Sequence, residues 1–187
     1  MSLTKSKFRT NCIRKIQNVS KRKNKLYRDS LVNKKLFKIL SKKKFQTILF
    51  YYPLSNEVDV RKILQKLRKK KSVFLPFMQG KSFKMVPFRL PLKKKKFAIF
   101  EAGNTIRNIN KIDIVVVPVI GVDGSMQRVG FGKGMYDRFF AKLQKRPYTI
   151  FVQSELCMTQ EKICDDYDVV GDILITPKHI IKNRATK

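Results

Sequence analysis

Hydrophobic residues recur at helical intervals in the first part of the chain, among many lysines and arginines. The apolar positions at such intervals between residues 5 and 45 include Phe8, Cys12, Ile16, Val19, Leu26, Leu31, Leu36, Ile39 and Leu40. Spacings of this kind put apolar side chains on one face of a helix and charged side chains on the other. The pattern predicts two basic amphipathic helices, with a break near Ser20.

Short continuous runs of apolar residues follow, and such runs indicate buried strands. The first run covers residues 47–52 and stops at Pro53, because proline cannot donate a hydrogen bond to a neighbouring strand. A helix is predicted after Asn56, and strands are predicted at 73–76 and 83–88. The strand at 47–52, the helix and the strand at 73–76 form a strand–helix–strand unit.

The strongest strand signal is the sequence IDIVVVP at residues 112–118. The run is apolar on both faces, as in a parallel strand covered on both sides, so we expect it at the centre of the sheet. A helix buried on one side is predicted from Gly134 onward, and further strands at 148–152 and 169–176. Residues 88–111 are rich in breakers and predict loops with short extended pieces.

Alternating strands and helices predict an α/β fold. We expect a single domain over residues 1–187, with a layered, mostly parallel sheet flanked by helices. Ligand sites in such folds lie at the carboxyl ends of the strands. Hydrophobic residues make up 43% of the chain and aromatic residues 11%, which is enough for a sizeable core and excludes a disordered protein.

Charge restricts the kinds of partner. The chain has 43 Lys and Arg residues against 13 Asp and Glu residues, a formal net charge of +30. A field of this sign concentrates anions, so the partners should carry phosphate or carboxylate groups. Nonspecific binding of nucleic acid is one such interaction. However, the chain has no RNP motif, and its basic residues are spread along the sequence instead of being gathered in one element.

The cysteine and histidine contents exclude several kinds of site. Cys12, Cys157 and Cys164 are odd in number and form no C-x-x-C pair, which disfavours a disulfide scaffold and a zinc site, so we expect packing roles for them. His179 is the only histidine, which excludes mechanisms built on several imidazoles. No segment approaches the ~20 apolar residues of a membrane span, and the N-terminus lacks a signal-peptide pattern. We therefore expect a cytoplasmic protein that does not bind a membrane.

The most informative segment is RVGFGKGMYDR at residues 128–138, between the predicted central strand and the buried helix. Gly130, Gly132 and Gly134 stand at alternate positions. Glycines allow backbone conformations closed to other residues and let backbone N–H groups approach a ligand, and the start of the next helix also favours anions. This arrangement predicts a phosphate-binding loop.

Charged residues within the segment extend this prediction. Arg128, Lys133 and Arg138 would add mobile positive charge. Asp137, in the first helical turn, could hold a magnesium ion beside phosphate oxygens or could only stabilise the start of the helix. The glycine spacing differs from both G-x-x-x-x-G-K-[ST] and G-x-G-x-x-G, so neither of those mechanisms applies.

This segment, with V-V-V-P before it, resembles the signature of the 5-formyltetrahydrofolate cyclo-ligase family. The family's loop is close to R-l-G-x-G-x-G-y-Y-D-R, and few other families share it. The resemblance extends over nearly the whole chain. Matching positions elsewhere are Lys5, Arg9, Tyr52, Pro53, Glu57, Val58, Asp59, residues 73–76, Met85, Glu101, Asp168, Asp172 and Thr176.

The resemblance implies an α/β enzyme with three kinds of site residue. It implies ATP binding by Lys5, Arg9, Arg128, Gly130, Phe131, Gly132, Lys133, Gly134, Met135, Tyr136 and Arg138. It also implies magnesium at Asp137 and Asp168, and the folate near Tyr52 and Glu57. Arg128 and Lys133 would carry the catalysis.

Several of these residues have a structural alternative. Lys5 and Arg9 are four residues apart and would project from one helical face toward an anion, but they could also form a solvated basic face. Tyr52 could be a core aromatic residue, and Asp168 a solvated loop carboxylate. Glu57 would open a helix, from which a carboxylate could reach the donor-rich edge of a pterin ring, an assignment that rests on the resemblance.

Three positions depart from the family pattern. Met135 replaces the first aromatic residue of the family's Y-Y-D, Met126 replaces a glycine before the loop, and Cys157 replaces a common glutamine. None of these changes removes a charged group. We expect Gly121 and Gly124 to supply the flexibility that the missing glycine would have given.

The reaction implied by the resemblance is the cyclisation of 5-formyltetrahydrofolate to 5,10-methenyltetrahydrofolate, with Mg-ATP converted to ADP and phosphate. A formamide oxygen is a poor leaving group, so its phosphorylation by ATP would activate the formyl carbon for attack by N10. The enzyme must then align the γ-phosphate and neutralise charge on the moving phosphoryl group. We expect a monomer that accepts folates with or without a polyglutamate tail, and nucleic-acid binding remains the rival function.

Overall fold

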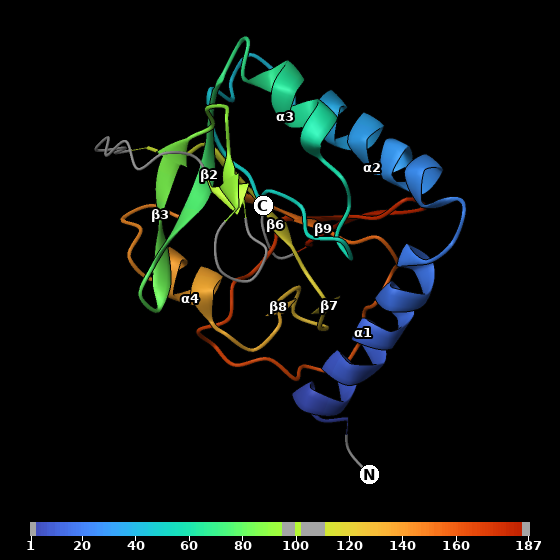
Figure 1. The fold of residues 1–187 in the computed structure, drawn as a ribbon. Coiled ribbons are helices and arrows are strands. Elements are labelled where there is room, and N and C mark those ends of the chain that lie inside the picture. Colours follow the sequence, from blue (N-terminus) through green and yellow to red (C-terminus); the bar gives the residue numbers. More distant parts are fainter. Residues whose placement is uncertain (1–2, 95–99, 102–110, 185–187) are drawn as a thin grey trace.

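The computed structural model describes residues 3–94, 100–101 and 111–184 (Figure 1). Its four helices are α1 (Lys5–Ser20), α2 (Lys25–Leu40), α3 (Arg61–Leu67) and α4 (Met135–Phe140). Its strands are β1 (Thr47–Leu49), β2 (Ser72–Gln79), β3 (Ser82–Pro87), β4 (Lys93–Lys94), β5 (Phe100–Glu101), β6 (Ile114–Pro118), β7 (Gly121–Val122), β8 (Arg128–Val129), β9 (Tyr148–Val152), β10 (Ile173–Ile175) and β11 (Ile180–Lys182).

A seven-stranded sheet in the order β11-β10-β9-β6-β1-β2-β3 forms the centre of the molecule. The five inner strands are parallel, and β3 and β11 pair antiparallel at the two edges. Two further pairs, β4 with β5 and β7 with β8, lie outside this sheet. The predicted mostly parallel α/β fold is confirmed, with β6 fourth among the seven strands as expected.

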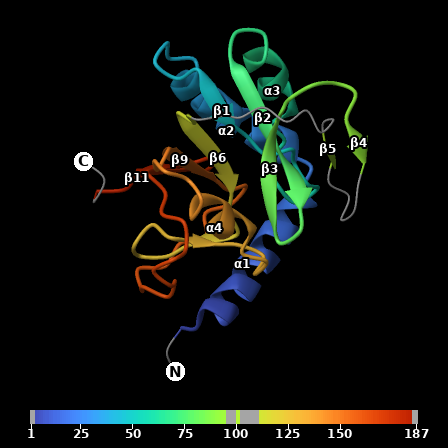
Figure 2. The same cartoon turned by 90° about the vertical axis from the view of Figure 1, so that its left-hand side faces the viewer.

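Alternate residues of β6 show why its sequence is apolar on both faces. Ile114 and Val116 join the core beneath α2 and α3, whereas Val115 and Val117 join the core on the opposite face, beside α4. Figures 1 and 2 show α2 and α3 side by side on one side of the sheet and α4 on the other. Burial on both faces removes the need for polar alternation along the strand.

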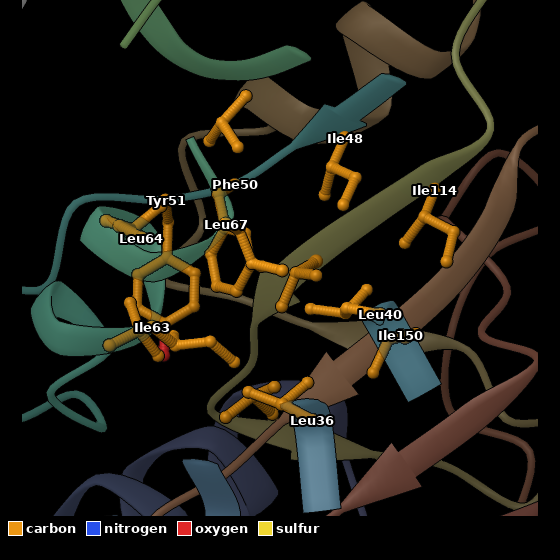
Figure 3. Close-up of a cluster of buried hydrophobic side chains, with 14 of the residues drawn as sticks. Leu36, Leu40, Ile48, Phe50, Tyr51, Ile63, Leu64, Leu67, Ile114 and Ile150 are labelled. Carbon is orange, nitrogen blue, oxygen red and sulfur yellow. The ribbon is translucent and has the colours of Figure 1, made fainter. Parts of the chain in front are cut away.

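The core beneath α2 and α3 brings together residues from helices and strands that are distant in sequence (Figure 3). Leu36 and Leu40 of α2, Ile48 of β1 and Ile150 of β9 all belong to this cluster, and all four are fully buried. Each fully buried aliphatic side chain contributes roughly 1.5–3 kcal/mol of transfer free energy. This core therefore stabilises the packing of α2 and α3 on the sheet.

Several element boundaries differ from the predicted ones. The first strand ends at Leu49, and α3 begins at Arg61, so the chain between them is an irregular connector instead of the start of a helix. The helix after Gly134 ends at Phe140, earlier than its apolar pattern indicated. Strand β11 was not predicted at all. Before α3, the backbone N–H groups of Asp59 and Arg61 donate to the side chains of Asp29 and Asp59. The short strand β11 pairs with β10.

The cysteines also differ from expectation, because Cys12 and Cys157 are disulfide-bonded in the structure. Both residues are buried in a small apolar cluster that joins α1 to the rest of the molecule. Cys164 is a free thiol at the margin of the same cluster. A separation of 145 residues in the sequence hid this pairing, which the spacing of the cysteines does not indicate.

None of the helices in the described part of the chain is both long enough and apolar enough to cross a membrane.

Candidate active site

A cavity of about 730 Å³ opens beside the carboxyl ends of β1 and β6. Tyr52 and Glu57 line one side of it, and residues of the 128–138 loop line another. The third wall is the β2–β3 hairpin, through Met78 and Phe83. Parallel strands that end together produce a crevice of this kind, and the cavity lies at the edge of the sheet where the sequence predicts a ligand site.

Two of the three loop glycines adopt backbone conformations that other residues disfavour. Gly132 has φ of 86° and Gly134 has φ of 57°, and α4 begins directly after Gly134. Gly130 is required for a different reason, because a Cβ there would collide with the guanidinium group of Arg128. The alternate glycines thus shape the loop, as predicted, by two separate physical effects.

Arg128 is buried instead of mobile, which corrects the sequence-based expectation. Arg128 is only 9% exposed, and the central carbon of its guanidinium group lies 5.0 Å from the centre of the Tyr136 ring. Nη1 also lies 3.4 Å from Oδ2 of Asp137. A cation held by an aromatic face and a carboxylate is preorganised, so it can meet a negative charge without first losing side-chain entropy.

Arg138 and Lys133 lie at the outer edge of the same loop. Arg138 donates from Nε to the carbonyl oxygen of Lys81 over 2.6 Å and from Nη2 to the carbonyl oxygen of Lys133. These bonds tie the tip of the β2–β3 hairpin to the loop. Lys133 and Lys81 line the cavity, and the side chain of Phe131 beside them is about half exposed.

Glu57 lies in the irregular connector between β1 and α3, so the expectation that it opens a helix is wrong. Its carboxylate accepts a hydrogen bond from the backbone N–H of Leu54 over 2.9 Å. Burial raises the pKa of Glu57 to about 7, while the Leu54 hydrogen bond and the charge of Arg128 act in the opposite direction. A carboxylate with little solvation at the edge of a cavity has a strong need for hydrogen-bond donors, which a ligand can supply.

Two tyrosines lie near Glu57 on the cavity wall. Burial, followed by the charge of Glu57, raises the pKa values of Tyr51 and Tyr136 above their ordinary value. Tyr51 donates its hydroxyl hydrogen to the carbonyl oxygen of Val58 over 3.0 Å. Both phenols are therefore neutral at physiological pH, and Tyr51 fixes the end of the connector that carries Glu57.

Helix α1 brings Lys5 and Arg9 to the glycine loop. Arg9 donates from Nε to the carbonyl oxygen of Gly130 over 2.7 Å. Lys5 forms an ion pair with Asp168 and another with Asp165, the latter at 2.9 Å. Burial alone would lower the pKa of Lys5, but the hydrogen bonds to these two carboxylates outweigh it and raise the pKa. The structure thus gives the two basic residues specific partners beside the loop.

Asp137 and Asp168 are brought close together by the short segment that follows Asp168. The backbone N–H of Val169 donates to Oδ1 of Asp137 over 3.3 Å, while Asp168 accepts from the N–H of Asp165 and from Lys5. Oδ2 of Asp137 contacts Nη1 of Arg128 over 3.4 Å, so both of its carboxylate oxygens have one partner each, at distances longer than an ordinary hydrogen bond. The described residues contain no group of three or more His, Cys, Asp or Glu side chains that could hold a metal ion.

This donor set fits magnesium delivered with a nucleotide. Magnesium sites are commonly completed by one or two carboxylates, water and the phosphate oxygens of the substrate. Asp137 lies directly after the glycine loop and provides such a carboxylate. Asp168 would provide a second one if Lys5 turned toward the phosphates.

The departures from the family pattern have structural consequences. Met126 has φ of 58°, a left-handed conformation that favours glycine, and its side chain is buried in the core. Gly121 and Gly124 do not supply flexibility in its place, which corrects that expectation. A Cβ on Gly121 would press on Phe8, and one on Gly124 would collide with the carbonyl group of Gln160.

Asp123 stabilises the turn in which Met126 lies. Its fully buried carboxylate accepts backbone hydrogen bonds from Ser125, Gln127, Ile163 and Cys164. These four bonds offset the strain at position 126. The sequence pattern did not single out Asp123, because only the tertiary fold brings residues 163–164 to it.

The hairpin wall of the cavity was also missed by sequence reasoning. Pro76 and Met78 line the cavity from β2, and Lys81 and Phe83 line it from the turn and β3. A signal was present in the alternation of Phe74, Pro76 and Met78, which places their side chains on one face of a strand. Nothing in that alternation says which cavity the face borders.

Comparison with known proteins agrees with this architecture. A family model described as the 5-formyltetrahydrofolate cyclo-ligase family matches residues 1–177. The chain is 24% identical over 148 residues to a 5-formyltetrahydrofolate cyclo-ligase of Haemophilus influenzae, covering 73% of this chain and 79% of the relative. It is 27% identical over 152 residues to the protein of that name from Mycoplasma pneumoniae, covering 81% and 85%.

Solved structures share the fold. An Aquifex aeolicus 5,10-methenyltetrahydrofolate synthetase superimposes with a TM-score of 0.80 at 23% identity, over 99% of this chain and 95% of that one. A synthetase from Mycoplasma pneumoniae superimposes with a TM-score of 0.68 at 22% identity, over 94% and 99%. The family match over nearly the whole chain is decisive: the chain belongs to the 5-formyltetrahydrofolate cyclo-ligase family, a family of ligases.

Proposed function

We propose that the protein converts 5-formyltetrahydrofolate and Mg-ATP to 5,10-methenyltetrahydrofolate, ADP and phosphate, through a phosphorylated formyl intermediate. The observation that carries this proposal is the placement of two chemically different groups on one cavity. The cationic glycine loop suits a polyphosphate, and the poorly solvated carboxylate of Glu57 suits a donor-rich heterocycle. Family membership supports the same pair of substrates.

The proposed reaction has two steps. The formyl oxygen attacks the γ-phosphorus of ATP, the bond to the β–γ bridging oxygen breaks, and ADP leaves. N10 of the folate then attacks the activated formyl carbon, loses its proton to water, and the carbon–oxygen bond to the phosphate breaks. Both steps depend on alignment and charge neutralisation, and neither requires a histidine base.

Specific residues would carry the charge during phosphoryl transfer. Arg128 is fixed by Tyr136 and Asp137, and Lys133 lies on the cavity side of the loop, so both can face the γ-phosphate. Arg9 and the backbone of residues 130–134 would hold the remaining phosphates, together with Lys5 and Arg138. Asp137 and Asp168 would hold magnesium, whose charge would offset that of the triphosphate.

Folate recognition is assigned to Glu57 and Tyr52. An ionised Glu57 would accept hydrogen bonds from the pterin N–H groups, and the ring of Tyr52 would pack on the ligand. We further propose that residues 1–187 act as one cytoplasmic, monomeric domain and that a polyglutamate tail on the folate is tolerated. The high net charge would favour such a tail as well as ATP.

The test is the appearance of the methenyl absorption band when the purified protein is mixed with 5-formyltetrahydrofolate and Mg-ATP. Omitting ATP or adding a magnesium chelator should abolish it. Lys133→Ala should slow turnover, whereas Lys142→Ala, a solvent-side lysine outside the cavity, should leave it unchanged. Absence of the band with the folded wild-type protein would refute the proposal. Light scattering on a sizing column would test the monomer.

A further inference from the structure

Three polar residues of α2 stand four positions apart and all contact the connector that carries Glu57. The connector is the irregular segment of residues 50–60, between β1 and α3. Lys25, Asp29 and Asn33 are separated by about one helical turn each, so they lie on one face of α2. None of the three lines the cavity of about 730 Å³.

Each of these residues contacts the backbone of the connector. Lys25 donates from Nζ to the carbonyl oxygen of Glu57 over 3.1 Å. Asp29 accepts through Oδ2 from the N–H of Asp59 over 3.2 Å, and Asn33 donates to the carbonyl oxygen of Asp59 over 2.7 Å. The two α2 charges also bind each other, since Nζ of Lys25 lies 2.6 Å from Oδ2 of Asp29.

The cost of burying this row of groups argues against a purely stabilising role. The side chain of Asp29 is 5% exposed and that of Lys25 is 21% exposed. Oδ1 of Asp29 and Oδ1 of Asn33 are buried without a hydrogen-bond partner among the described residues. A buried ion pair with unsatisfied atoms is often no more stable than an apolar replacement, and the best-attested benefit of such groups is a unique geometry.

The geometry at stake is the position of the Glu57 carboxylate. The connector is irregular, so no helix or strand ladder sets the backbone of Glu57. Lys25 binds the backbone carbonyl oxygen of Glu57. The side chain of that same residue carries the carboxylate, and Glu57 lines the cavity. Displacements of about 1 Å in a binding group are enough to weaken recognition by large factors.

We propose that Lys25 and Asp29 are positioning residues for Glu57 and thereby set the affinity for the folate. They act through the connector backbone and touch neither substrate. The inference rests on the proposed function. It implies that a change in α2, outside the cavity, alters the KM for 5-formyltetrahydrofolate and leaves the KM for ATP in place, because the glycine loop is held by α1 and α4.

The chain offers a matched control on the same helix. Lys35 donates from Nζ to the carbonyl oxygens of Thr176 at 2.9 Å and Pro177 at 2.8 Å. It is therefore also a lysine of α2 that binds backbone carbonyl groups, but those of residues 176–177 instead of those of the connector. Lys35→Met measures the effect of losing such an anchor in general.

The experiment compares steady-state kinetics of Lys25→Met, Lys25→Arg and Lys35→Met. Lys25→Met should raise the KM for the folate roughly tenfold, with the KM for ATP and kcat within about twofold. Lys25→Arg should restore most of the affinity, and Lys35→Met should leave both KM values unchanged. If Lys25→Met does not fold, Lys25→Met with Asp29→Asn removes the unpaired buried charge and serves in its place.

A double-mutant cycle with Glu57→Gln decides whether the effect passes through Glu57. If it does, Lys25→Met should have little further effect on the folate KM once Glu57 is glutamine. Equal folate KM values for Lys25→Met and Lys35→Met, or fully additive effects in the cycle, would overturn the inference while leaving the proposed function intact. A wild-type protein that makes no methenyl product would overturn both.

Discussion

Helices α1 and α2 have the same length and the same basic amphipathic pattern, yet they serve different parts of the molecule. Helix α2 packs on the central sheet, and Val32, Leu36 and Leu40 are fully buried there. Helix α1 lies apart from that sheet beside β7 and β8 (Figure 1). Its Lys5 and Arg9 contact the groups that shape the glycine loop.

The difference between the two helices shows how one sequence pattern can have two outcomes. Amphipathicity specifies that a helix has one face to bury and does not specify against what. The apolar face of α2 meets strands, and its polar face meets the Glu57 connector. The apolar face of α1 meets a small cluster around Cys12, and its Lys5 and Arg9 contact Asp168 and the glycine loop.

Truncating the buried face of α2 should have the largest effect. Leu36→Ala removes a fully buried side chain from the core beneath the sheet and should lower the free energy of unfolding by about 2–5 kcal/mol. Ile16→Ala in α1 should cost less, since its cluster is smaller and closer to the surface. Urea unfolding of both variants measures this. Equal losses would mean that α1 is as deeply integrated as α2.

The basic side of α1 should show the reverse pattern, with a large effect on ligand binding and a small one on stability. Arg9→Ala removes a charged donor beside Gly130 and should weaken ATP binding by about 1.5–3 kcal/mol. Lys15→Ala is the control, because it removes one positive charge from an exposed position of the same helix. ATP-induced shifts in the melting temperature report the difference, and equal shifts in the two variants would speak against a role for Arg9.

Protonation of Glu57 should change the stability of the fold and the affinity for the folate in opposite directions. Its raised pKa means that the folded state binds the proton more tightly, so this contribution to stability is present below about pH 4.5 and is lost as the pH rises through about 7. Glu57→Gln should therefore stabilise the protein at pH 8 by roughly 1–2 kcal/mol and have little effect at pH 4.

Folate binding should respond with the opposite sign. The wild-type affinity should fall as the pH drops below about 7, because a protonated Glu57 loses acceptor capacity. Glu57→Gln should bind weakly at every pH. Calorimetric titration at several pH values checks both statements. A pH-independent affinity in the wild type would mean that Glu57 does not contact the pterin.

The smallest effect is expected at Met126, in the turn between β7 and β8. Met126→Ala and Met126→Gly both lose the buried side chain, but only glycine relieves the left-handed backbone. Met126→Gly should therefore be more stable than Met126→Ala by about 1 kcal/mol. Thermal unfolding of the pair measures the strain. The opposite order would show that the left-handed backbone at position 126 carries no strain.

The elements that could be predicted were those with strong local signals. The apolar run at 112–118 indicated a central parallel strand, and β6 is central. The glycines at alternate positions indicated a specially shaped loop, and Gly132 and Gly134 have positive φ there. The limits of elements were predicted less well, as at Glu57, because backbone groups in the connector are held by α2 residues that lie 26 to 32 positions earlier. Such long-range partners leave no periodic pattern.

The sequence alone thus determined the family and the layered α/β fold, and it predicted the residue types of a candidate ligand site, since these depend on local conformational preferences and on a motif of fixed spacing. Only the tertiary structure decided which charges are free and which are held. Arg128 is fixed between Tyr136 and Asp137, Lys5 binds Asp168, and Cys12 meets Cys157. Burial and charge pairing depend on contacts between distant segments, so they are properties of the folded chain and not of any one stretch of it.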